Sequence, residues 1–366
     1  MADFETGDLN AFREEVQSWI AAHFPSSLKH KPNPMSREAL AFPDADQEAW
    51  RRAMGAKGWG TPTWPQEYGA AGLTAAHARI IQDELLHAGA YNPIGGMGVM
   101  MLGPTLMEFG TKAQLDQHLP PIIRGDFQWC QGFSEPGAGS DLVSLQTRAE
   151  DRGDHFLVNG QKIWTSGAQW ARWCFCLVRT DPARKYDGIS LVLFDMAATG
   201  VEVRPIKLIS GNSSFCEMFL TDVKVPKDQL VGPLNAGWTI AKRLLQHERS
   251  GLSGPAHAPT GRPLAELARD YIGVDEDGRI AAPDLRMRII ENEMESRVFR
   301  QTAQRVAAEA KGNAGPSAAS SIMKNVSTRI AQQRAELAIE IMGYRGLGWE
   351  GGGFASEELG VTRDWL

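Results

Sequence analysis

A glycine- and serine-rich run, from Gln131 to Asp141, lies about a third of the way along the chain. It places Ser134, a Glu-Pro pair and Ser140 among three glycines. Glycines let backbone N–H groups approach an anion closely, and serine hydroxyls add further donors. The run therefore predicts a site for a phosphate-bearing ligand, although the same composition taken alone also fits a plain turn.

A second segment, residues 159–167, places Trp164 next to the hydroxyls of Thr165 and Ser166. An indole face can stack on a planar heterocycle, and neighbouring hydroxyls can hydrogen-bond to the polar edge of such a ring. For this segment alone, a core tryptophan at the end of a strand is the competing interpretation.

Glu248 is the carboxylate whose spacing best suits acid–base chemistry. It follows Leu244 and Leu245 on a predicted helix, and the spacing places it on the apolar side of that helix. Burial there would raise the pKa of Glu248 toward a value useful for removing a weakly acidic proton. The alternative is an ordinary surface glutamate paired with Lys or Arg.

The elements that must position these residues fall into three zones, 1–125, 126–234 and 235–366. The first and third zones carry apolar residues at helical spacing, whereas the middle zone consists of short alternating runs between turn residues. We therefore predict a mainly α protein with a central β domain. An N-terminal helical domain precedes an antiparallel sheet or barrel, and a C-terminal helical bundle follows it.

Individual segments support this division. Asn159-Gly160 predicts a hairpin turn, and the Pro- and Gly-rich stretch 254–284 predicts a long irregular connection. Apolar stripes at helical spacing, in 9–20, 285–306 and 322–341, predict three helices, of which the last two are long. Five runs predict strands, namely 155–158, 173–178, 189–194, 201–209 and 215–225.

The bulk composition excludes several function classes. The chain has 366 residues, a net charge of −6 and a pI of about 5.8, which argues against a nucleic-acid or anionic-membrane partner. Its four cysteines form no Cys-x-x-Cys pair, so we expect no metal site and interpret them as small buried residues in a reducing compartment. No signal-peptide pattern and no run near the roughly 20 apolar residues of a membrane span is present, so we expect a cytoplasmic protein.

Together, the two central motifs resemble the flavin-site signatures of the acyl-CoA dehydrogenase family. Residues 134–141 are similar to the family's Thr/Ser-Glu-Pro-x-Ala-Gly-Ser-Asp element, and residues 159–167 to its Asn-Gly-x-Lys-x-Trp element. Residues 64–69 and 221–226 resemble two further family elements in the same order, so the resemblance covers most of the chain. It implies the family fold with a middle antiparallel β-barrel, FAD as cofactor, and oxidation of the Cα–Cβ bond of an acyl-CoA thioester.

The resemblance also implies roles for single residues. Ser134 would hydrogen-bond the pyrimidine edge of the flavin, and Gly139 and Ser140 would line the FAD pyrophosphate. Ser140 would also lie near the CoA. Trp164 would pack on the flavin ring, and the Ser166 hydroxyl would meet the ring near N5.

Three further cofactor contacts complete this implied set. Gln131 and Phe133 would bracket the flavin through backbone contacts, and Thr165 adds a hydroxyl beside the indole. The Glu248-Arg249 pair matches one of the two positions at which family members carry the catalytic glutamate. The other position lies in a C-terminal Gly-rich loop, which would come after the last residue of this sequence.

The implied reaction removes the α-proton with Glu248 while the β-hydrogen leaves as hydride to flavin N5. Arg249 would support the CoA end of the substrate. The product would be the trans-2-enoyl-CoA, and the electrons would pass on to a separate electron-transfer flavoprotein.

Departures from the family pattern point to a subgroup. Residues 261–267 lack the family's Phe-Gly, Glu340 stands where a Gln is usual, and the family's C-terminal tail is not in the sequence. Residues 129–136 resemble a bacterial subgroup that often acts on bulky or steroid-type acyl-CoA and in part forms two-gene heterotetramers. We therefore expect a homo- or heterotetramer. Four glycines either make room for a bulky acyl group or allow close helix packing, namely Gly95, Gly96, Gly98 and Gly103.

Two other functions stay open. One is a non-catalytic structural partner of a homologous subunit, against which the intact motifs and Glu248 argue. The other is a flavin oxidase or monooxygenase on the same fold, because fold alone does not fix the reaction. Glu248 suits proton abstraction better than oxygen chemistry.

Overall fold

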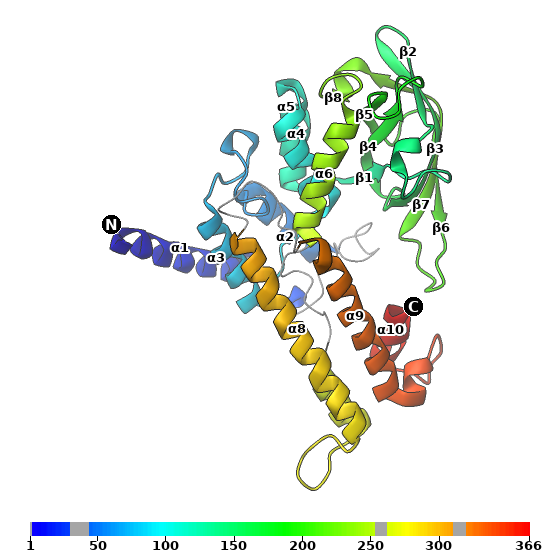
Figure 1. Cartoon of the computed structure of the whole chain (residues 1–366). Helices are drawn as coiled ribbons and strands as arrows, with labels where there is room; N and C mark the ends of the chain where they lie inside the picture. The colour runs from blue at the N-terminus through cyan, green and yellow to red at the C-terminus, as the bar shows by residue number, and fades with distance from the viewer. Residues whose placement is uncertain (1, 30–43, 253–261, 310–319) are drawn as a thin grey trace. The chain divides into compact units, whose positions relative to one another are not determined.

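The computed structural model describes residues 2–29, 44–252, 262–309 and 320–366 (Figure 1). Helices dominate both ends of the chain and the strands lie in its middle, which confirms the predicted mainly α class with a central β domain.

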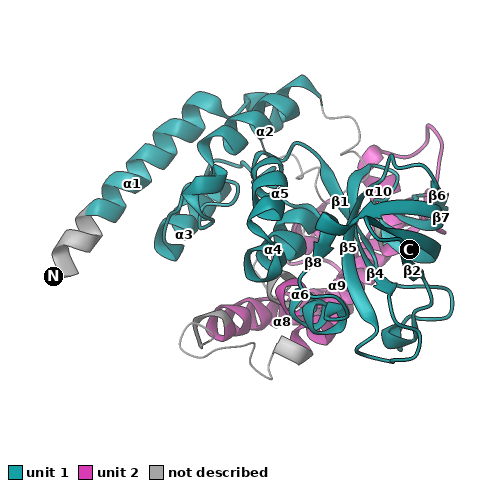
Figure 2. Ribbon diagram, turned by 90° about the horizontal axis from the view of Figure 1, so that it is seen from above, with its two compact units in different colours: residues 1–207, 212–245 teal, residues 208–211, 246–366 magenta. Residues whose placement is uncertain are grey.

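The chain divides into two compact units, coloured separately in Figure 2. The first unit comprises Met1–Lys207 and Asn212–Leu245, and the second comprises Leu208–Gly211 and Gln246–Leu366. Helix α6 (Gly237–Leu252) begins in the first unit and ends in the second. The three predicted domains, with boundaries after residues 125 and 234, stay a prediction.

The N-terminal part of the first unit is helical. On α1 the predicted stripe is confirmed, because Val16 and Ile20 are buried against Trp50 and neighbouring aromatic residues. Its helices are α1 (Ala2–His23), α2 (Ala45–Lys57), α3 (Ala75–His87), the π-helix η5 (Gly98–Leu102), α4 (Gly103–Phe109) and α5 (Lys112–Arg124).

Two of the four glycines singled out in the sequence allow close packing. A Cβ at Gly98 would lie 2.8 Å from the Trp129 ring, and one at Gly103 would lie 2.0 Å from the Trp64 ring. Both distances are shorter than real carbon contacts. For these two positions, the packing interpretation is the one that the structure supports.

Helix α5 leads directly into the sheet. The Thr111 hydroxyl and the Gln114 side chain form a capping box at its start, and Gly125 ends it in the left-handed conformation with φ of 66°. The Gln114 amide also donates to the Asp228 and Leu230 carbonyls, at 2.6 and 2.8 Å, which ties the helix to the end of the sheet.

The sheet has eight strands in the order β6-β7-β3-β2-β4-β5-β8, with β1 paired to β4. Most pairs are antiparallel, as predicted, but β1 runs parallel to β4. Because β1 arrives from a helix rather than from a hairpin, no tight turn imposes an antiparallel pairing on it. The strands are β1 (Gln128–Gly132), β2 (Arg148–Asp151), β3 (His155–Ser166), β4 (Ala171–Arg179), β5 (Ile189–Asp195), β6 (Val201–Ile206), β7 (Phe215–Pro226) and β8 (Leu230–Val231).

The predicted hairpin turn at Asn159-Gly160 is wrong, because both residues lie inside β3. The register of β3 against β7 shifts between Val158 and Gly160, so the pair marks a bulge. The Asn159 side chain exchanges two hydrogen bonds with Asp222 on β7, each 2.9 Å long. A Cβ at Gly160 would lie 2.7 Å from Cα of Thr147, so glycine serves a close backbone approach there.

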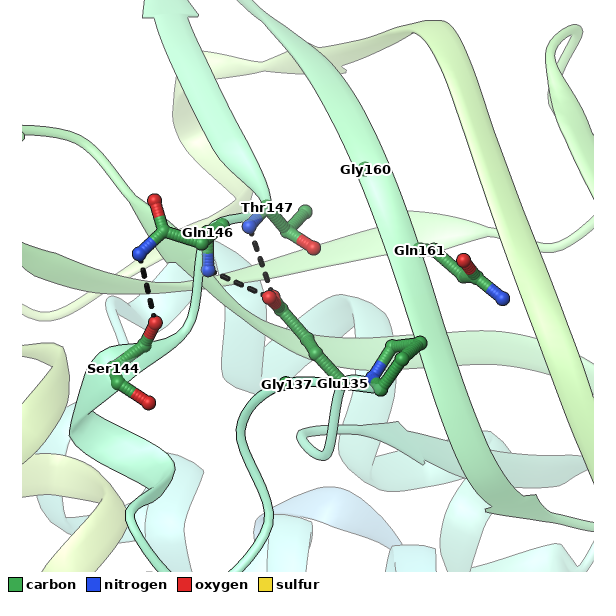
Figure 3. A pocket seen from close by; sticks show the side chains of 8 residues that line it. Glu135, Gly137, Ser144, Gln146, Thr147, Gly160 and Gln161 are labelled. Carbon is green, nitrogen blue, oxygen red and sulfur yellow. Dashed lines mark hydrogen bonds between the residues drawn. The ribbon is translucent and has the colours of Figure 1, made fainter.

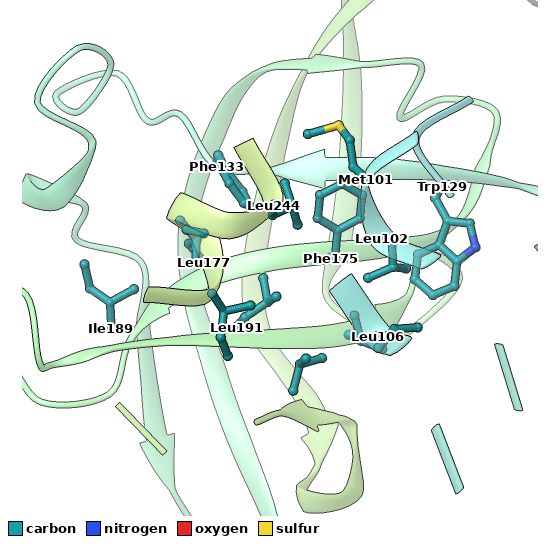
Figure 4. Close-up of a cluster of buried hydrophobic side chains, with 14 of the residues drawn as sticks. Met101, Leu102, Leu106, Trp129, Phe133, Phe175, Leu177, Ile189, Leu191 and Leu244 are labelled. Carbon is teal, nitrogen blue, oxygen red and sulfur yellow. The ribbon is translucent and has the colours of Figure 1, made fainter. Parts of the chain in front are cut away.

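Each face of the sheet has its own apolar core. One cluster, drawn in Figure 4, combines residues of η5, α4 and α6 with β-strand residues that include Phe175, Leu177 and Leu191. The opposite cluster contains all four cysteines, which are buried and unpaired as predicted, namely Cys130, Cys174, Cys176 and Cys216. Within the described residues, no cluster of His, Cys, Asp and Glu has the make-up of a metal site.

The second unit is helical. It contains α7 (Leu264–Tyr271), α8 (Pro283–Glu309), α9 (Ser320–Met342) and α10 (Ser356–Trp365). Of the stretch predicted as irregular, residues 254–261 lie outside the described residues, and the remainder contains one short helix, followed by a bridge between Val274 and Ile280. Leu264 and Leu267 on α7 are buried with the apolar residues of α8 and α9, and this burial accounts for the helix despite the surrounding Pro and Gly.

The apolar stripe of α8 is only partly covered. Ile289 and Val306 are buried, whereas Ile290, Met294 and Val298 are 47–62% exposed. The periodicity predicted the helix correctly, but part of the face that it marks is open. Among the helices that the structure describes, none has the length and apolar character that crossing a membrane requires.

Candidate cofactor and active site

The Gly/Ser run forms a tight turn directly after β1. Glu135 and Ala138 exchange two backbone hydrogen bonds, each 3.0 Å long. Gly139 and Ser140 follow on the surface, and a Cβ at Gly139 would meet no atom within 4 Å. The turn therefore leaves Gly139 and Ser140 open to solvent, as a phosphate-binding segment requires.

The Glu135 side chain, by contrast, points inward and is only 8% exposed. Its carboxylate accepts hydrogen bonds from the backbone N–H groups of Gln146 (2.6 Å) and Thr147 (2.9 Å), as Figure 3 shows. The fully buried Lys162 ammonium lies 2.8 Å from it. Burial favours the neutral acid, but Lys162 and these N–H groups outweigh burial and hold the pKa of Glu135 below its ordinary value.

Two hydrogen bonds join the Gly/Ser turn to β3. The Lys162 ammonium donates to the Phe133 carbonyl at 3.1 Å, and the Ile163 N–H donates to the Ser134 carbonyl at 2.9 Å. Trp164 is the next residue on β3. The structure thus brings the two motifs together, with Ser134 fixed beside the strand end that carries the indole.

Trp164 is not a core residue. Its backbone adopts a left-handed conformation with φ of 59°, and the side chain is 55% exposed and meets the Phe215 ring edge-on. A tryptophan in such a conformation is uncommon, and strain of this kind is typical of functional sites. The competing interpretation of a buried tryptophan is wrong.

The two hydroxyls after the indole face different ways. The Ser166 side chain is half-buried, whereas Thr165 is 1% exposed and its hydroxyl finds no hydrogen-bond partner among the described residues. Alternation along a strand places Thr165 on the inner side and its two neighbours on the outer side.

The remaining residues of the predicted cofactor set lie on and after β1. Gln131 is half-buried and pairs in register with Phe175 of β4. Phe133 is buried, and its ring meets the Phe175 ring edge-on at 5.9 Å. Phe133 therefore belongs to the core below the turn.

A pocket of about 430 Å³ opens beside this turn (Figure 3). Its walls come from the turn, the segment before β2, and β3, through Glu135, Pro136, Gly137, Ser144, Gln146, Thr147, Gly160 and Gln161.

Sequence reasoning did not single out Glu135 or Lys162. The available signal was a charged residue at an inward position of a strand whose other inward residues are apolar, such as Phe156 and Val158.

The predicted base lies on α6. Leu244 is fully buried in the first unit, and Glu248 follows one helical turn later in the second unit with a half-buried side chain. Glu248 therefore lies on the same side of α6 as Leu244, as predicted. Arg249 is the next residue on α6, and its side chain lies outside the part of the chain that the structure describes.

Comparison with known proteins identifies the family of the chain. The N-terminal, middle and C-terminal domains of acyl-CoA dehydrogenase match residues 6–126, 130–223 and 235–362. The chain is 38% identical to the acyl-CoA dehydrogenase IpdE1 of Mycobacterium tuberculosis, with 74% of this chain and 71% of that protein covered. It is 33% identical to IpdE1 of Mycolicibacterium smegmatis, with 95% and 89% covered. The protein belongs to the acyl-CoA dehydrogenase family.

A longer relative and a solved structure extend the comparison. The acyl-CoA dehydrogenase FadE34 of Mycobacterium tuberculosis is 38% identical over 85% of this chain, which spans only 42% of FadE34. The ChsE4–ChsE5 complex from the same species matches with a TM-score of 0.76 and 31% identity, over 98% of this chain and 90% of that one. As an acyl-CoA dehydrogenase, the protein is an oxidoreductase, and members of its family are generally flavoproteins that use FAD.

Two residues at the departures from the family pattern are engaged within the second unit. Arg262 forms ion pairs with Asp270, Glu266 and Glu357. Glu340, where a Gln is usual in acyl-CoA dehydrogenases, lies 2.6 Å from Arg288 on α8. Both side chains therefore have partners within their own chain.

Proposed function

We propose that this acyl-CoA dehydrogenase binds FAD at the junction of the two motifs and oxidises the Cα–Cβ bond of an acyl-CoA to the trans-2-enoyl-CoA. The observation that carries the proposal is the exposed Trp164 indole, held in a left-handed backbone next to the anchored Ser134. A large apolar ring kept in solvent at a conformational cost is best explained by a flat ligand that covers it.

The residues present fit FAD. Ser134 and the outer-facing Ser166 offer hydroxyls to a polar ring edge, and Trp164 offers a face. The open turn at Gly139 and Ser140 suits a pyrophosphate, because a ligand oxygen can approach its backbone without meeting a side chain. Gln131, Phe133 and Thr165 would contribute through their backbone, since Phe133 and Thr165 have buried side chains.

Glu248 is proposed as the base that takes the α-proton onto its carboxylate. The electron pair of the Cα–H bond then forms the Cα–Cβ double bond as the β-hydrogen leaves with its own pair. FAD, when bound, supplies the acceptor for that hydride. Arg249 and Ser140 are proposed to hold the CoA, which fixes the α-carbon in front of the base.

Anaerobic titration of the FAD-loaded chain with a panel of acyl-CoAs tests this proposal. Flavin absorbance should bleach with at least one class, and Glu248→Gln should abolish bleaching while FAD stays bound. Glu276→Gln, which changes an exposed glutamate, is the matched control and should bleach normally. Bleaching that persists in Glu248→Gln would reject the base assignment.

The substrate is proposed to be a bulky, steroid-type acyl-CoA. The support is similarity to the Tcur3481–Tcur3483 steroid ACAD, at 28% identity and a TM-score of 0.75 over 98% of this chain. In the titration, a steroid-type acyl-CoA should bleach the flavin at lower concentration than straight-chain acyl-CoAs. The opposite ranking would reject the substrate class but not the reaction. An electron-transfer flavoprotein is the proposed acceptor of the electrons.

The working form is proposed to be a homo- or heterotetramer. Ile290, Met294 and Val298 leave an apolar stripe exposed on α8, which a further subunit would cover. Arg262 already forms ion pairs with acidic residues of its own chain. Its guanidinium is therefore less free to contact the cofactor of a neighbouring subunit. This supports the two-gene arrangement, and it predicts that co-expression with a homologous subunit increases the FAD content.

Two outcomes would favour the other functions. A chain that purifies colourless even when it is co-expressed with a partner subunit would favour a structural role. Rapid reaction of the reduced flavin with oxygen would favour an oxidase or monooxygenase.

A further inference from the structure

We propose that the buried ion pair of Glu135 and Lys162 is a positioning device, which holds the turn that carries Ser134 against the strand end that carries Trp164. The inference rests on the proposed FAD site. It assigns a role to two residues that the family resemblance leaves without one.

Stability alone does not account for this pair. Lys162 is fully buried and Glu135 nearly so. Taking both charges out of water is costly, and well-packed apolar residues in place of such a pair are often equally or more stabilising. What apolar side chains cannot supply is a fixed set of hydrogen bonds to the backbone.

The bonds of this pair fix three segments at once. The Lys162 ammonium, from β3, bonds the Phe133 carbonyl and the Glu135 carboxylate. That carboxylate also accepts the N–H groups of Gln146 and Thr147, where the loop returns to the sheet. Both ends of the exposed stretch that contains Gly139 and Ser140 are therefore anchored to one buried carboxylate.

A second buried cation completes the loop support. The Arg179 guanidinium on β4 donates to the Val143 carbonyl at 2.6 Å and to the Leu145 carbonyl at 3.3 Å. Burial lowers the pKa of Arg179, and the negative Glu135 opposes that shift. The charged and titratable groups facing the carboxylate are thus Lys162 from β3, and Arg179 and the Cys176 thiol from β4.

The first unit offers a matched control. Glu84 on α3 is 4% exposed and accepts hydrogen bonds from Arg13 and Gln17 of α1. It resembles Glu135 in burial and charge pairing, and none of its partners belongs to either motif. Loss of its charge should weaken folding without touching the cofactor site.

The test compares Glu135→Gln with Glu84→Gln in the full chain, together with its partner subunit if FAD loading needs one. FAD affinity is measured by quenching of flavin fluorescence, and ring placement by visible circular dichroism of bound flavin. Glu135→Gln should bind FAD at least about tenfold more weakly and change the dichroism, because a displacement of about 1 Å is enough for effects of this size. Glu84→Gln should keep the wild-type affinity and spectrum.

Equal effects of the two variants would overturn the positioning role, and so would a Glu135→Gln protein with wild-type affinity and spectrum. A wild-type chain that binds no FAD would instead reject the proposed function, so the two failures are distinguishable.

A second variant keeps the test open if Glu135→Gln does not fold. Lys162→Met removes the cation and leaves Glu135 buried, so the pKa of the carboxyl should rise. FAD affinity of this variant should improve as pH falls, since the neutral acid tolerates burial. A pH profile parallel to that of the wild type would overturn the proposal.

Discussion

Strand β4 and helix α8 are both rich in apolar residues, but the apolar side chains of the two elements are buried to different extents. On β4 the residues from Cys174 to Val178 are completely buried between two clusters of the first unit. On α8 the apolar residues alternate between buried positions and positions that are more than half exposed, such as Met294 and Val298. The first unit thus buries the apolar residues of its strand completely, whereas the second leaves part of an apolar helix face exposed.

The largest expected effect tests the closed core. Phe175→Ala on β4 removes a fully buried ring and should lower the free energy of unfolding by about 3–5 kcal/mol, because a cavity remains. Urea denaturation followed by circular dichroism measures it. Met294→Ala is the counterpart on α8 and should change stability by less than about 0.5 kcal/mol. Similar losses in both variants would break the comparison.

A smaller effect tests how closely the sheet packs. Gly160→Ala places a methyl group 2.7 Å from Cα of Thr147, so the backbone must shift, at a cost of about 1–3 kcal/mol. Gly137→Ala, whose methyl would meet no atom within 4 Å, is the control and should be nearly neutral. The same denaturation experiment decides between them.

The next effect depends on pH. Glu135 has a lowered pKa in the folded chain, so its contribution to stability is present above the ordinary glutamate pKa and is lost as pH falls through the lower folded value. The acid limb of the stability profile, below about pH 4, should therefore be less steep in Glu135→Gln. Unchanged steepness would mean that other carboxylates dominate this limb.

The substitution with the smallest expected effect on folding is Met294→Glu, and it should have the clearest effect on assembly. Met294→Glu places a charge on the exposed stripe of α8 and should change the stability of a single chain by less than about 0.5 kcal/mol. It should nevertheless shift the mass measured by light scattering toward smaller species. Wild-type assembly in this variant would show that another surface joins the subunits.

Much of the fold follows from local sequence patterns. The stripe with Val16 and Ile20 predicted α1, and alternating runs predicted five of the strands. Asn159-Gly160 led to a wrong prediction of a hairpin turn because tight turns and β-bulges favour the same residues. Only the register of β3 against β7 distinguishes the two. The parallel pairing of β1 is likewise a long-range property that no local pattern encodes.

The candidate site was predictable to a similar extent. The motifs identified the exposed Trp164 and the open turn at Ser140, because both are local features. The pairing of Glu135 with Lys162 was missed, since 27 residues separate them and the contact exists only in the folded sheet. Periodicity also marked the apolar stripe of α8, but it did not distinguish the residues that are buried from those that are exposed.

The reactivity of the four cysteines can be used to measure how often the sheet opens. All of them are buried in the first unit, and the sequence from Gln246 onward contains none. Burial raises the pKa of Cys174 and Cys176 well above that of a free thiol, so these thiols are poorly able to attack a thiol-specific dye while the sheet is folded. The rate of cysteine labelling would then report local opening of the sheet and would not respond to unfolding of the second, helical unit.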